Sequence, residues 1–362
     1  MQITKPTFLL DKRKVLANIE KMSRKAKDAN LFFRPHFKTH CSAEIGNWFR
    51  DFGVEGITVS SVDMAIYFAD NGWNDITIAF PVNILQWQEI DALAEKINLN
   101  IIVENIQAID FLEKKLTHPV GVFIKTDTGY NRTGIDAEDF DKILILLNRL
   151  KNCVNLIFIG FLTHAGNTYK SRGKDEVAKI MEEAKNRLLA LKLFFKPHFP
   201  MMQLSWGDTP SCSLGNDFYG LDEMRPGNFV FFDEMQVQIG SCTSDEIACA
   251  VVCPVVATHS ERNEAVIYGG AIHFSKEFIT VNGMPFYGRV VRFSNNSWDC
   301  TKNIGYIRSL SQEHGIISIK DKNSELNAGD LVAVLPVHSC LTANLMKQYT
   351  ILETGEIIHS FC

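Results

Sequence analysis

The feature that most constrains the fold is a repeated alternation of short apolar runs with amphipathic, helix-like stretches. Helix-like stretches at 84–96, 137–150 and 175–193 separate some of these runs. Runs of apolar or β-branched residues occur at 31–33, 56–60, 76–80, 100–103, 121–125, 156–162, 202–205 and 228–232. Such alternation is typical of βαβ units and a parallel sheet. Eight strands predict an α/β fold with a (β/α)8 TIM barrel, and a doubly wound open sheet is the alternative.

The chain changes character after about residue 239. Long helical patterns stop, and short runs rich in Val, Ile, Tyr and Phe are separated by turn signals such as Asn-Gly at 282–283. This pattern predicts an antiparallel β domain. We therefore expect the barrel over residues 12–239 and the β domain over 240–362. A short strand within residues 1–11 is expected to join the β domain.

Charge and composition exclude several classes of partner. The 362 residues carry a formal net charge of −5, and no run of Lys and Arg stands out. This balance argues against a nucleic-acid or anionic-membrane surface. The sequence shows no secretory signal pattern and no apolar window long enough to span a bilayer. We expect a cytoplasmic protein, in which the nine scattered cysteines would be free thiols.

Lys38 follows the first predicted strand. The Arg34-Pro35 pair breaks the apolar run, and Lys38 comes three residues later, between His36 and His40. Barrel enzymes carry functional side chains where strands end. A lysine amine can form a Schiff base once its pKa is lowered. This stretch alone slightly favours the alternative, a solvated lysine at a strand-to-loop junction.

Other polar side chains also follow predicted strands. Arg132 follows the fifth strand, His164 and Tyr169 follow the sixth, the turn at 207–209 follows the seventh, and the segment 225–228 leads into the eighth. Small turn residues let backbone N–H groups approach a phosphate. A lysine at one strand end and a phosphate-binding turn at another indicate pyridoxal 5'-phosphate (PLP) as the cofactor.

A second candidate group lies near the C-terminus, at His338 and Cys340. In an extended strand these positions would share a face and could hold one metal ion. An imidazole and a thiolate suit zinc. Two ligands are too few for a structural site, so water or substrate would complete the coordination. The alternative is a buried cysteine beside a surface histidine, and His314 is a weaker candidate ligand.

Together these segments resemble the D-threonine aldolase and metal-dependent D-serine dehydratase family. In chain order they are Arg-Pro-His-Phe-Lys-Thr at 34–39, His-Ala-Gly at 164–166, Gly-Asp-Thr-Pro at 207–210, Arg-Pro-Gly-Asn at 225–228, Glu-His-Gly at 313–315 and Pro-Val-His-Ser-Cys at 336–340. The resemblance covers nearly the whole chain. It implies an alanine racemase-like fold, with a PLP-binding barrel followed by a β domain, and a homodimer.

The resemblance also implies a role for each candidate residue. Lys38 and His164 would be catalytic, and Lys38 would hold PLP covalently. The further cofactor-binding residues would be Arg132 at the phenolic oxygen or the substrate carboxylate, Tyr169 at the pyridine ring or its nitrogen, and Thr209, Gly227 and Asn228 at the phosphate. His338 and Cys340 would bind a divalent metal, with zinc expected ahead of manganese.

Cys340 bears on the reaction that the resemblance implies. The second metal ligand is Cys in dehydratase-type members and Asp in aldolases. Cys340 therefore favours β-elimination from a D-3-hydroxy amino acid, such as D-serine, to a 2-oxo acid and ammonia. The alternatives are retro-aldol cleavage to glycine and an aldehyde, an amino-acid racemase, and a PLP-binding protein without catalysis.

Two residues depart from the pattern of the family. Cys41 stands where relatives often carry Lys, and Asp208 stands in a phosphate turn that often has a hydroxyl residue. A carboxylate facing a phosphate would be repelled by it, so we expect the side chain of Asp208 to point away.

Overall fold

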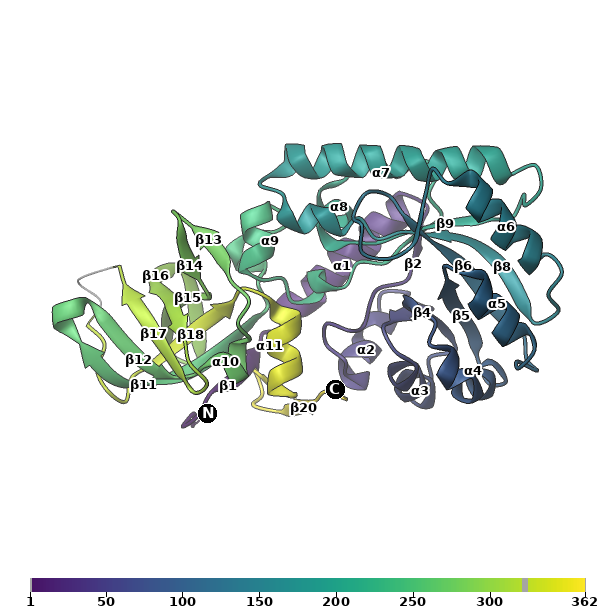
Figure 1. Cartoon of the computed structure of the whole chain (residues 1–362). Helices are drawn as coiled ribbons and strands as arrows, with labels where there is room; N and C mark the ends of the chain where they lie inside the picture. Colours follow the sequence, from purple (N-terminus) through teal and green to yellow (C-terminus); the bar gives the residue numbers. More distant parts are fainter. Residues whose placement is uncertain (1, 321–324, 362) are drawn as a thin grey trace. The chain divides into compact units, whose positions relative to one another are not determined.

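The computed structural model describes residues 2–320 and 325–361 and divides into two compact units (Figure 1). The barrel unit comprises residues 20–38 and 46–227, and the β unit comprises residues 1–19, 39–45 and 228–362. Each unit contains its own main sheet. The domain boundaries at residues 11 and 239 stay predictions.

The barrel unit contains eight parallel strands in the order β2-β10-β9-β8-β6-β5-β4-β3. Their bounds are β2 (Phe32–Phe33), β3 (Ile57–Val59), β4 (Asp75–Pro81), β5 (Asn98–Val103), β6 (Val120–Asp127), β8 (Leu156–Leu162), β9 (Gln203–Trp206) and β10 (Glu223–Met224), and the short β7 (Ile135–Asp136) pairs with β6. Just beyond β2, His36 forms a parallel bridge with Thr58 of β3, which joins the two ends of the sheet. The predicted barrel of parallel strands is confirmed.

Helices connect most of these strands (Figure 1). They are α1 (Lys12–Asp28), α2 (Ala43–Arg50), α3 (Val62–Asp70), η1 (Ile84–Gln86), α4 (Trp87–Ala94), α5 (Ile106–Glu113), α6 (Phe140–Leu150), η2 (Gly166–Lys170), α7 (Lys174–Phe195) and α8 (Thr209–Leu214). Polar side chains fix where several of them begin. The side chains of Ser61 and Asn105 each accept a hydrogen bond from the backbone N–H three residues later, at 3.1 and 2.8 Å. Such caps satisfy N–H groups that the helix itself leaves unpaired.

The predicted eighth strand at 228–232 is wrong. Residues Asn228–Val230 form the 3-10 helix η3, and the eighth strand is β10, which pairs with β2 and β9. The apolar pattern of the sequence does not reveal this strand, because it begins with the charged residue Glu223 and charged residues are rarely buried. The segment 225–227 therefore follows the eighth strand instead of leading into it.

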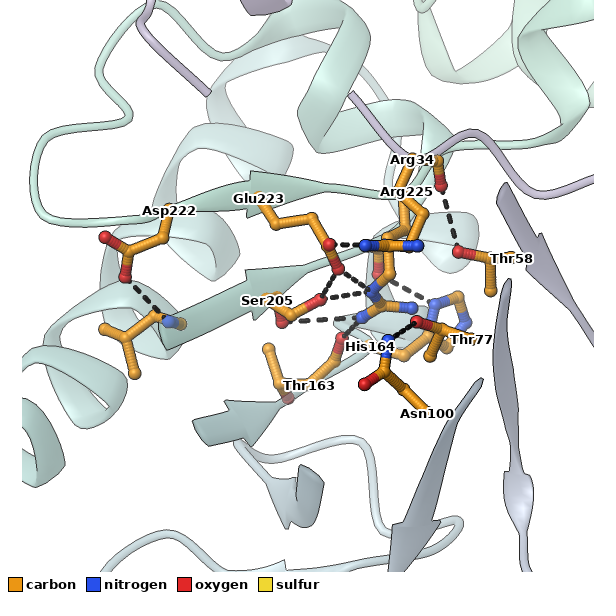
Figure 2. Close-up of polar contacts among 12 residues, drawn as sticks. Arg34, Thr58, Thr77, Asn100, Thr163, His164, Ser205, Asp222, Glu223 and Arg225 are labelled. Carbon is orange, nitrogen blue, oxygen red and sulfur yellow. Dashed lines mark hydrogen bonds and ion pairs between the residues drawn. The ribbon is translucent and has the colours of Figure 1, made fainter. Parts of the chain in front are cut away.

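A buried ion-pair network explains how Glu223 is accommodated (Figure 2). Arg34 Nε donates to Glu223 Oε2 at 2.5 Å, and Ser205 Oγ donates to Glu223 Oε1 at 2.5 Å. Arg34 also donates to both carboxylate oxygens of Asp75, at 2.7 and 2.9 Å. Burial opposes the charge of Arg34, but Glu223 and Asp75 raise its pKa above the ordinary value. The network therefore ties together strands from both ends of the sheet.

Replacing Glu223 with alanine is expected to destabilise the barrel unit by about 3 kcal/mol, because removing one partner of a buried pair leaves the other charge poorly compensated. This loss is at the low end of the range for breaking a buried ion pair, because Asp75 still pairs with Arg34. Urea unfolding followed by circular dichroism measures the change. Glu20→Ala is the matched control, since Glu20 forms an exposed pair with Arg24 and its loss should cost less than about 1 kcal/mol. Equal losses in the two variants would contradict a stabilising role for the network.

The β unit is built on antiparallel strands. Their bounds are β1 (Thr7–Leu10), β11 (Cys249–His259), β12 (Glu264–Tyr268), β13 (Ile279–Val281), β14 (Met284–Phe286), β15 (Gly288–Ser294), β16 (Ser297–Leu310), β17 (His314–Ile319), β18 (Leu331–Pro336), β19 (Gln348–Ile351) and β20 (Ile357–His359). β12 pairs with both β17 and β11, so the strands β11-β12-β17-β16-β15-β18 close into a ring. β1 pairs antiparallel with β11 and parallel with β19. The β unit also contains the helices α9 (Glu234–Ile239), η4 (Ser244–Glu246), η5 (Ser260–Arg262), α10 (Ala271–Phe274) and α11 (Ser339–Met346). The predicted antiparallel β domain is confirmed.

The expectation of free thiols is wrong for Cys41, which forms a disulfide. Free thiols are found at Cys153, Cys212, Cys242, Cys249, Cys253, Cys300 and Cys340, and Cys362 lies outside the described residues. Cys41 lies beside the end of the chain, since its carbonyl accepts a hydrogen bond from the N–H of Phe361 at 2.8 Å. Spacing along the sequence does not reveal such a meeting of distant segments.

Among the helices of the described residues, none combines the length and the apolar character needed to cross a membrane.

Candidate active site

Lys38 lies at the carboxyl end of the first barrel strand, as predicted. It comes two residues after the bridge between His36 and Thr58, and its backbone N–H donates to His36 Nδ1 at 3.4 Å. Carboxyl ends of parallel strands meet at one end of a barrel. The loops after β6, β8, β9 and β10 therefore belong to the same end of the barrel unit as Lys38.

The loop after β6 carries Arg132. The carboxylate of Asp127 accepts hydrogen bonds from the backbone N–H groups of Gly129, Tyr130 and Asn131, at 2.9, 2.9 and 2.8 Å. The guanidinium of Arg132 lies over the ring of Tyr130, with 5.1 Å from Cζ to the ring centroid. Asp127 thus fixes the loop, and Tyr130 provides a surface on which Arg132 rests.

His164, in the loop after β8, lies in the field of four cations. Its Nδ1 donates to the carbonyl of Gly207 at 2.8 Å, which leaves Nε2 as an acceptor. Burial lowers the pKa of His164 well below its ordinary value, and the nearby positive charges lower it further. These charges are Lys38, Arg132, Lys125 and Arg225. His164 is therefore neutral at neutral pH, in a positively charged surrounding that suits an anionic ligand.

The turn after β9 contains an unused hydroxyl group. Thr209 Oγ1 is buried and has no hydrogen-bond partner within the described part of the chain. The backbone N–H of Thr209 donates to the hydroxyl oxygen of Tyr169 at 3.3 Å. A buried hydroxyl without a partner is costly unless a ligand satisfies it. The hydroxyl groups of Thr209 and Tyr169 both fit a phosphate bound at this turn. The position of Tyr169 therefore favours a contact with the phosphate of PLP over one with the ring nitrogen.

Asp208 points away from this turn, as expected. Its carboxylate accepts hydrogen bonds from Thr168 Oγ1 at 2.9 Å and from the backbone N–H of Ser211 at 2.7 Å, and so caps α8. Burial raises the pKa of Asp208 to about 6, although these hydrogen bonds oppose the shift.

Arg225 and Lys125 are two of the cations near His164, and the sequence analysis assigned neither of them a role. Arg225, which follows β10, donates from Nε to Ser205 Oγ at 2.5 Å and from Nη2 to the carbonyl of Thr163 at 2.6 Å (Figure 2). Lys125 lies within β6, is 5% exposed, and donates from Nζ to the carbonyl of Thr126 at 2.8 Å. Burial, followed by the charge of Arg225, lowers the pKa of Lys125 to about 7. A lysine inside an apolar strand was the only signal available in the sequence.

Lys125→Met is expected to stabilise the protein most at pH 7 and below, where the wild type must bury a charged amine. The pKa of Lys125 falls from 10.5 to about 7 on folding, so the unfolded chain binds more protons between these values. The stability of the wild type relative to the variant therefore rises by up to about 1.4 kcal/mol per pH unit across this range. Urea unfolding at several pH values measures the difference, with Lys151→Met as the exposed control. A constant difference across the range would contradict a buried, titrating Lys125.

Gly227 and Asn228 follow Arg225 in the chain, and both are buried. The side-chain amide of Asn228 donates to Asp233 Oδ2 at 2.6 Å and contacts Ser339 Oγ at 3.1 Å. The predicted phosphate contact of Asn228 would therefore come from its backbone.

In the β unit, the extended geometry predicted for His338 and Cys340 is wrong. β18 ends at Pro336, His338 is the N-cap of α11, and Cys340 lies in the first turn of that helix. The two side chains nevertheless meet, because the imidazole is hydrogen-bonded to Cys340. Burial acts to lower the pKa of His338, but its bonds to Cys340 and Glu277 raise it to about 11.

Further polar groups surround this pair within the β unit. Thr39 Oγ1 lies 3.2 Å from Cys340 Sγ, and Asn228 Nδ2 donates to the same sulfur at 3.5 Å. Asp233 holds Asn228 and also accepts from the backbone N–H of Ser339 at 2.9 Å. Donors of this kind stabilise a thiolate.

The pair of His338 and Cys340 fits a divalent metal such as zinc. The imidazole of His338 is hydrogen-bonded to the side chain of Cys340, and the carboxylate of Glu277 accepts from Nδ1 of the same imidazole at 2.6 Å. Among the described residues, no group of three or more His, Cys, Asp or Glu side chains could hold a metal. Water or substrate would therefore complete the coordination, as in a catalytic site. His314 is an exposed residue at the start of β17.

Two family models match consecutive parts of the chain. The alanine racemase N-terminal domain matches residues 10–235, and a putative serine dehydratase domain matches residues 248–352. The D-serine dehydratase of Dictyostelium discoideum is 27% identical, over 98% of this chain and 95% of the relative. The D-threo-3-hydroxyaspartate dehydratase of Delftia sp. is 26% identical, over 98% and 97%. A D-threonine aldolase of Arthrobacter sp. is 23% identical, over 98% and 91%.

A solved structure shows the same fold. A metal-free mutant of D-threo-3-hydroxyaspartate dehydratase superimposes with a TM-score of 0.91 at 23% identity, covering 99% of this chain and 98% of that one. The relatives are dehydratases and an aldolase, and the fold is alanine racemase-like. The resemblance that the sequence motifs indicated is confirmed.

Proposed function

Because the chain belongs to the alanine racemase N-terminal domain family, we propose that it is a PLP- and divalent-metal-dependent lyase that dehydrates a D-3-hydroxy amino acid to a 2-oxo acid and ammonia. The observation that carries the proposal is the contact between His338 and Cys340, an imidazole and a thiol with no third ligand among the described residues. Such a pair leaves coordination positions open for a substrate hydroxyl group. Relatives named D-serine dehydratase make D-serine the first substrate to test.

Most of the residues that would hold PLP belong to the barrel unit. Lys38 would provide the amine for the covalent link, and the Thr209 hydroxyl, with no partner of its own among the described residues, would donate to the phosphate. Tyr169 would support the same phosphate, together with Gly227 and the backbone of Asn228. Arg132 would contact the phenolic oxygen or the substrate carboxylate.

PLP supplies an electron sink for the charge that develops at Cα, and the metal supplies a Lewis acid at the β-hydroxyl group. Lys38 Nζ would take the α-proton. His164 is neutral and has Nε2 available as an acceptor. It would therefore orient the amine of Lys38 without adding a further positive charge. His338 and Cys340 would hold the metal, and the enamine released would hydrolyse to the 2-oxo acid and ammonia.

The same side chains would also permit retro-aldol cleavage, in which a base takes the proton of the β-hydroxyl group and the Cα–Cβ bond breaks. The relative named D-threonine aldolase supports this second candidate. Cys340 favours dehydration. A racemase would need a second base on the opposite face of the cofactor, for which the sequence offers no strong candidate. A PLP-binding protein without catalysis would have no use for the metal pair.

The experiment that tests the proposal is an assay on the two enantiomers of serine, with PLP and zinc or manganese supplied. Pyruvate and ammonia should form from D-serine only, and a chelator should stop their release. Turnover of L-serine, or turnover of D-serine that a chelator leaves unchanged, would contradict the proposal. A homodimer and a cytoplasmic location remain predictions.

A further inference from the structure

One carboxylate of the β unit, that of Glu277, is hydrogen-bonded to the imidazole of His338. Glu277 Oε2 accepts a hydrogen bond from His338 Nδ1 at 2.6 Å. Glu277 lies between α10 and β13, 61 residues before His338. The contact therefore comes from tertiary structure and not from a local turn.

Two hydrogen bonds fix the segment that leads into Glu277. The backbone N–H of Glu277 donates to Ser275 Oγ at 3.1 Å. Ser275 follows α10 with a φ of 68°, a positive value that residues other than glycine rarely adopt. Thr342 Oγ1 of α11 donates to the carbonyl of Phe274 at 3.4 Å. The helix that carries Cys340 is thereby tied to the turn that presents Glu277.

We propose that Glu277 is a positioning residue for the metal site. By accepting from Nδ1–H, it fixes the tautomer in which Nε2 carries the lone pair, and it orients that lone pair for a metal ion. A carboxylate in this position also makes an imidazole a stronger ligand. The inference rests on the proposed function, because it requires that His338 bind the metal.

A positioning role for Glu277 and the role of an ordinary surface ion pair have different expected effects. The side chain of His338 is 25% exposed and that of Glu277 is 36% exposed, so the pair is only partly open to solvent. An exposed pair of this type contributes about 1 kcal/mol or less to stability. A carboxylate that orients a ligand instead changes metal affinity by about 10–100-fold. Metal affinity therefore distinguishes the two roles.

The test measures the zinc dissociation constant of PLP-loaded protein, by competition with a chromogenic chelator. The variants are Glu277→Gln and Glu277→Ala, and Glu356→Gln is the control, because it removes one exposed carboxylate from the same unit. Glu277→Ala should weaken zinc binding by about 10–100-fold. Glu277→Gln should lose less, since its amide oxygen still accepts from Nδ1. PLP content and the control should be unchanged.

Wild-type zinc affinity in both Glu277 variants would overturn the inference. Glu277→Gln keeps the volume of the side chain, so it decides the matter if Glu277→Ala fails to fold. His338→Ala distinguishes this failure from failure of the proposed function. If His338→Ala binds zinc as tightly as the wild type, the pair is not the metal site, and both the inference and the proposed function are wrong. If only His338→Ala loses zinc, the proposed site stands and the role of Glu277 is refuted.

Discussion

Lys38→Ala should lower the turnover of D-serine by at least about 10³-fold, because the variant lacks the amine that would both hold PLP and take the α-proton. The physical reason is that no other described amine occupies the end of the first barrel strand. The rate of pyruvate release measures the loss. Borohydride reduction of the wild-type protein, followed by peptide mass mapping, should place the pyridoxyl group on Lys38.

The buried Lys125 provides a sharp control for this prediction. Its amine has a pKa lowered to about 7, by burial and by the charges of Arg225 and Arg132, so it is an alternative attachment point for the cofactor in the same unit. Attachment of the pyridoxyl group to Lys125, with Lys38→Ala still active, would reverse the assignment. Lys151→Ala, an exposed lysine, should leave turnover unchanged.

Removal of the proposed metal site is expected to have the second large effect. Cys340→Ala should lower the dehydration rate by roughly 10³-fold, because several kcal/mol of charge stabilisation at the leaving hydroxyl would be lost. The protein should keep its PLP, since Lys38 and Thr209, which would hold the cofactor, belong to the barrel unit. Metal content by atomic emission and pyruvate release together measure the effect.

Two comparisons sharpen this second prediction. Cys340→Asp supplies another anionic ligand and should recover metal, whereas Cys253→Ala removes another buried cysteine of the same unit and should keep activity. Full activity of chelated Cys340→Ala protein would refute metal-assisted dehydration.

The fold was predictable from the sequence where a local pattern matched the tertiary role. Parallel strands buried on both faces, such as β3, appear as continuous runs of apolar or β-branched residues. The eighth strand could not be found in this way. β10 is only two residues long and begins with Glu223, whose burial depends on Arg34, a residue 189 positions away. The apolar run that follows it looks like a strand and is instead a buried 3-10 helix with a loop.

The candidate site was predictable to the extent that its chemistry lies in short motifs. Lys38, His164 and the turn at Thr209 all follow strands, and the barrel then brings strand ends together. His338 and Cys340 also meet, but through the start of a helix and not along a strand. Glu277 could not be predicted, because it is one of many acidic residues and only the folding of α10 against α11 brings it to His338.

The measurement that tests the central claim most directly is identification of the products formed from D-threonine by the PLP-loaded protein with zinc or manganese. This substrate can undergo either reaction at the same site. If Cys340 is the metal ligand that accompanies dehydration, 2-oxobutanoate and ammonia should form. Glycine and acetaldehyde would contradict this expectation and would identify the protein as an aldolase.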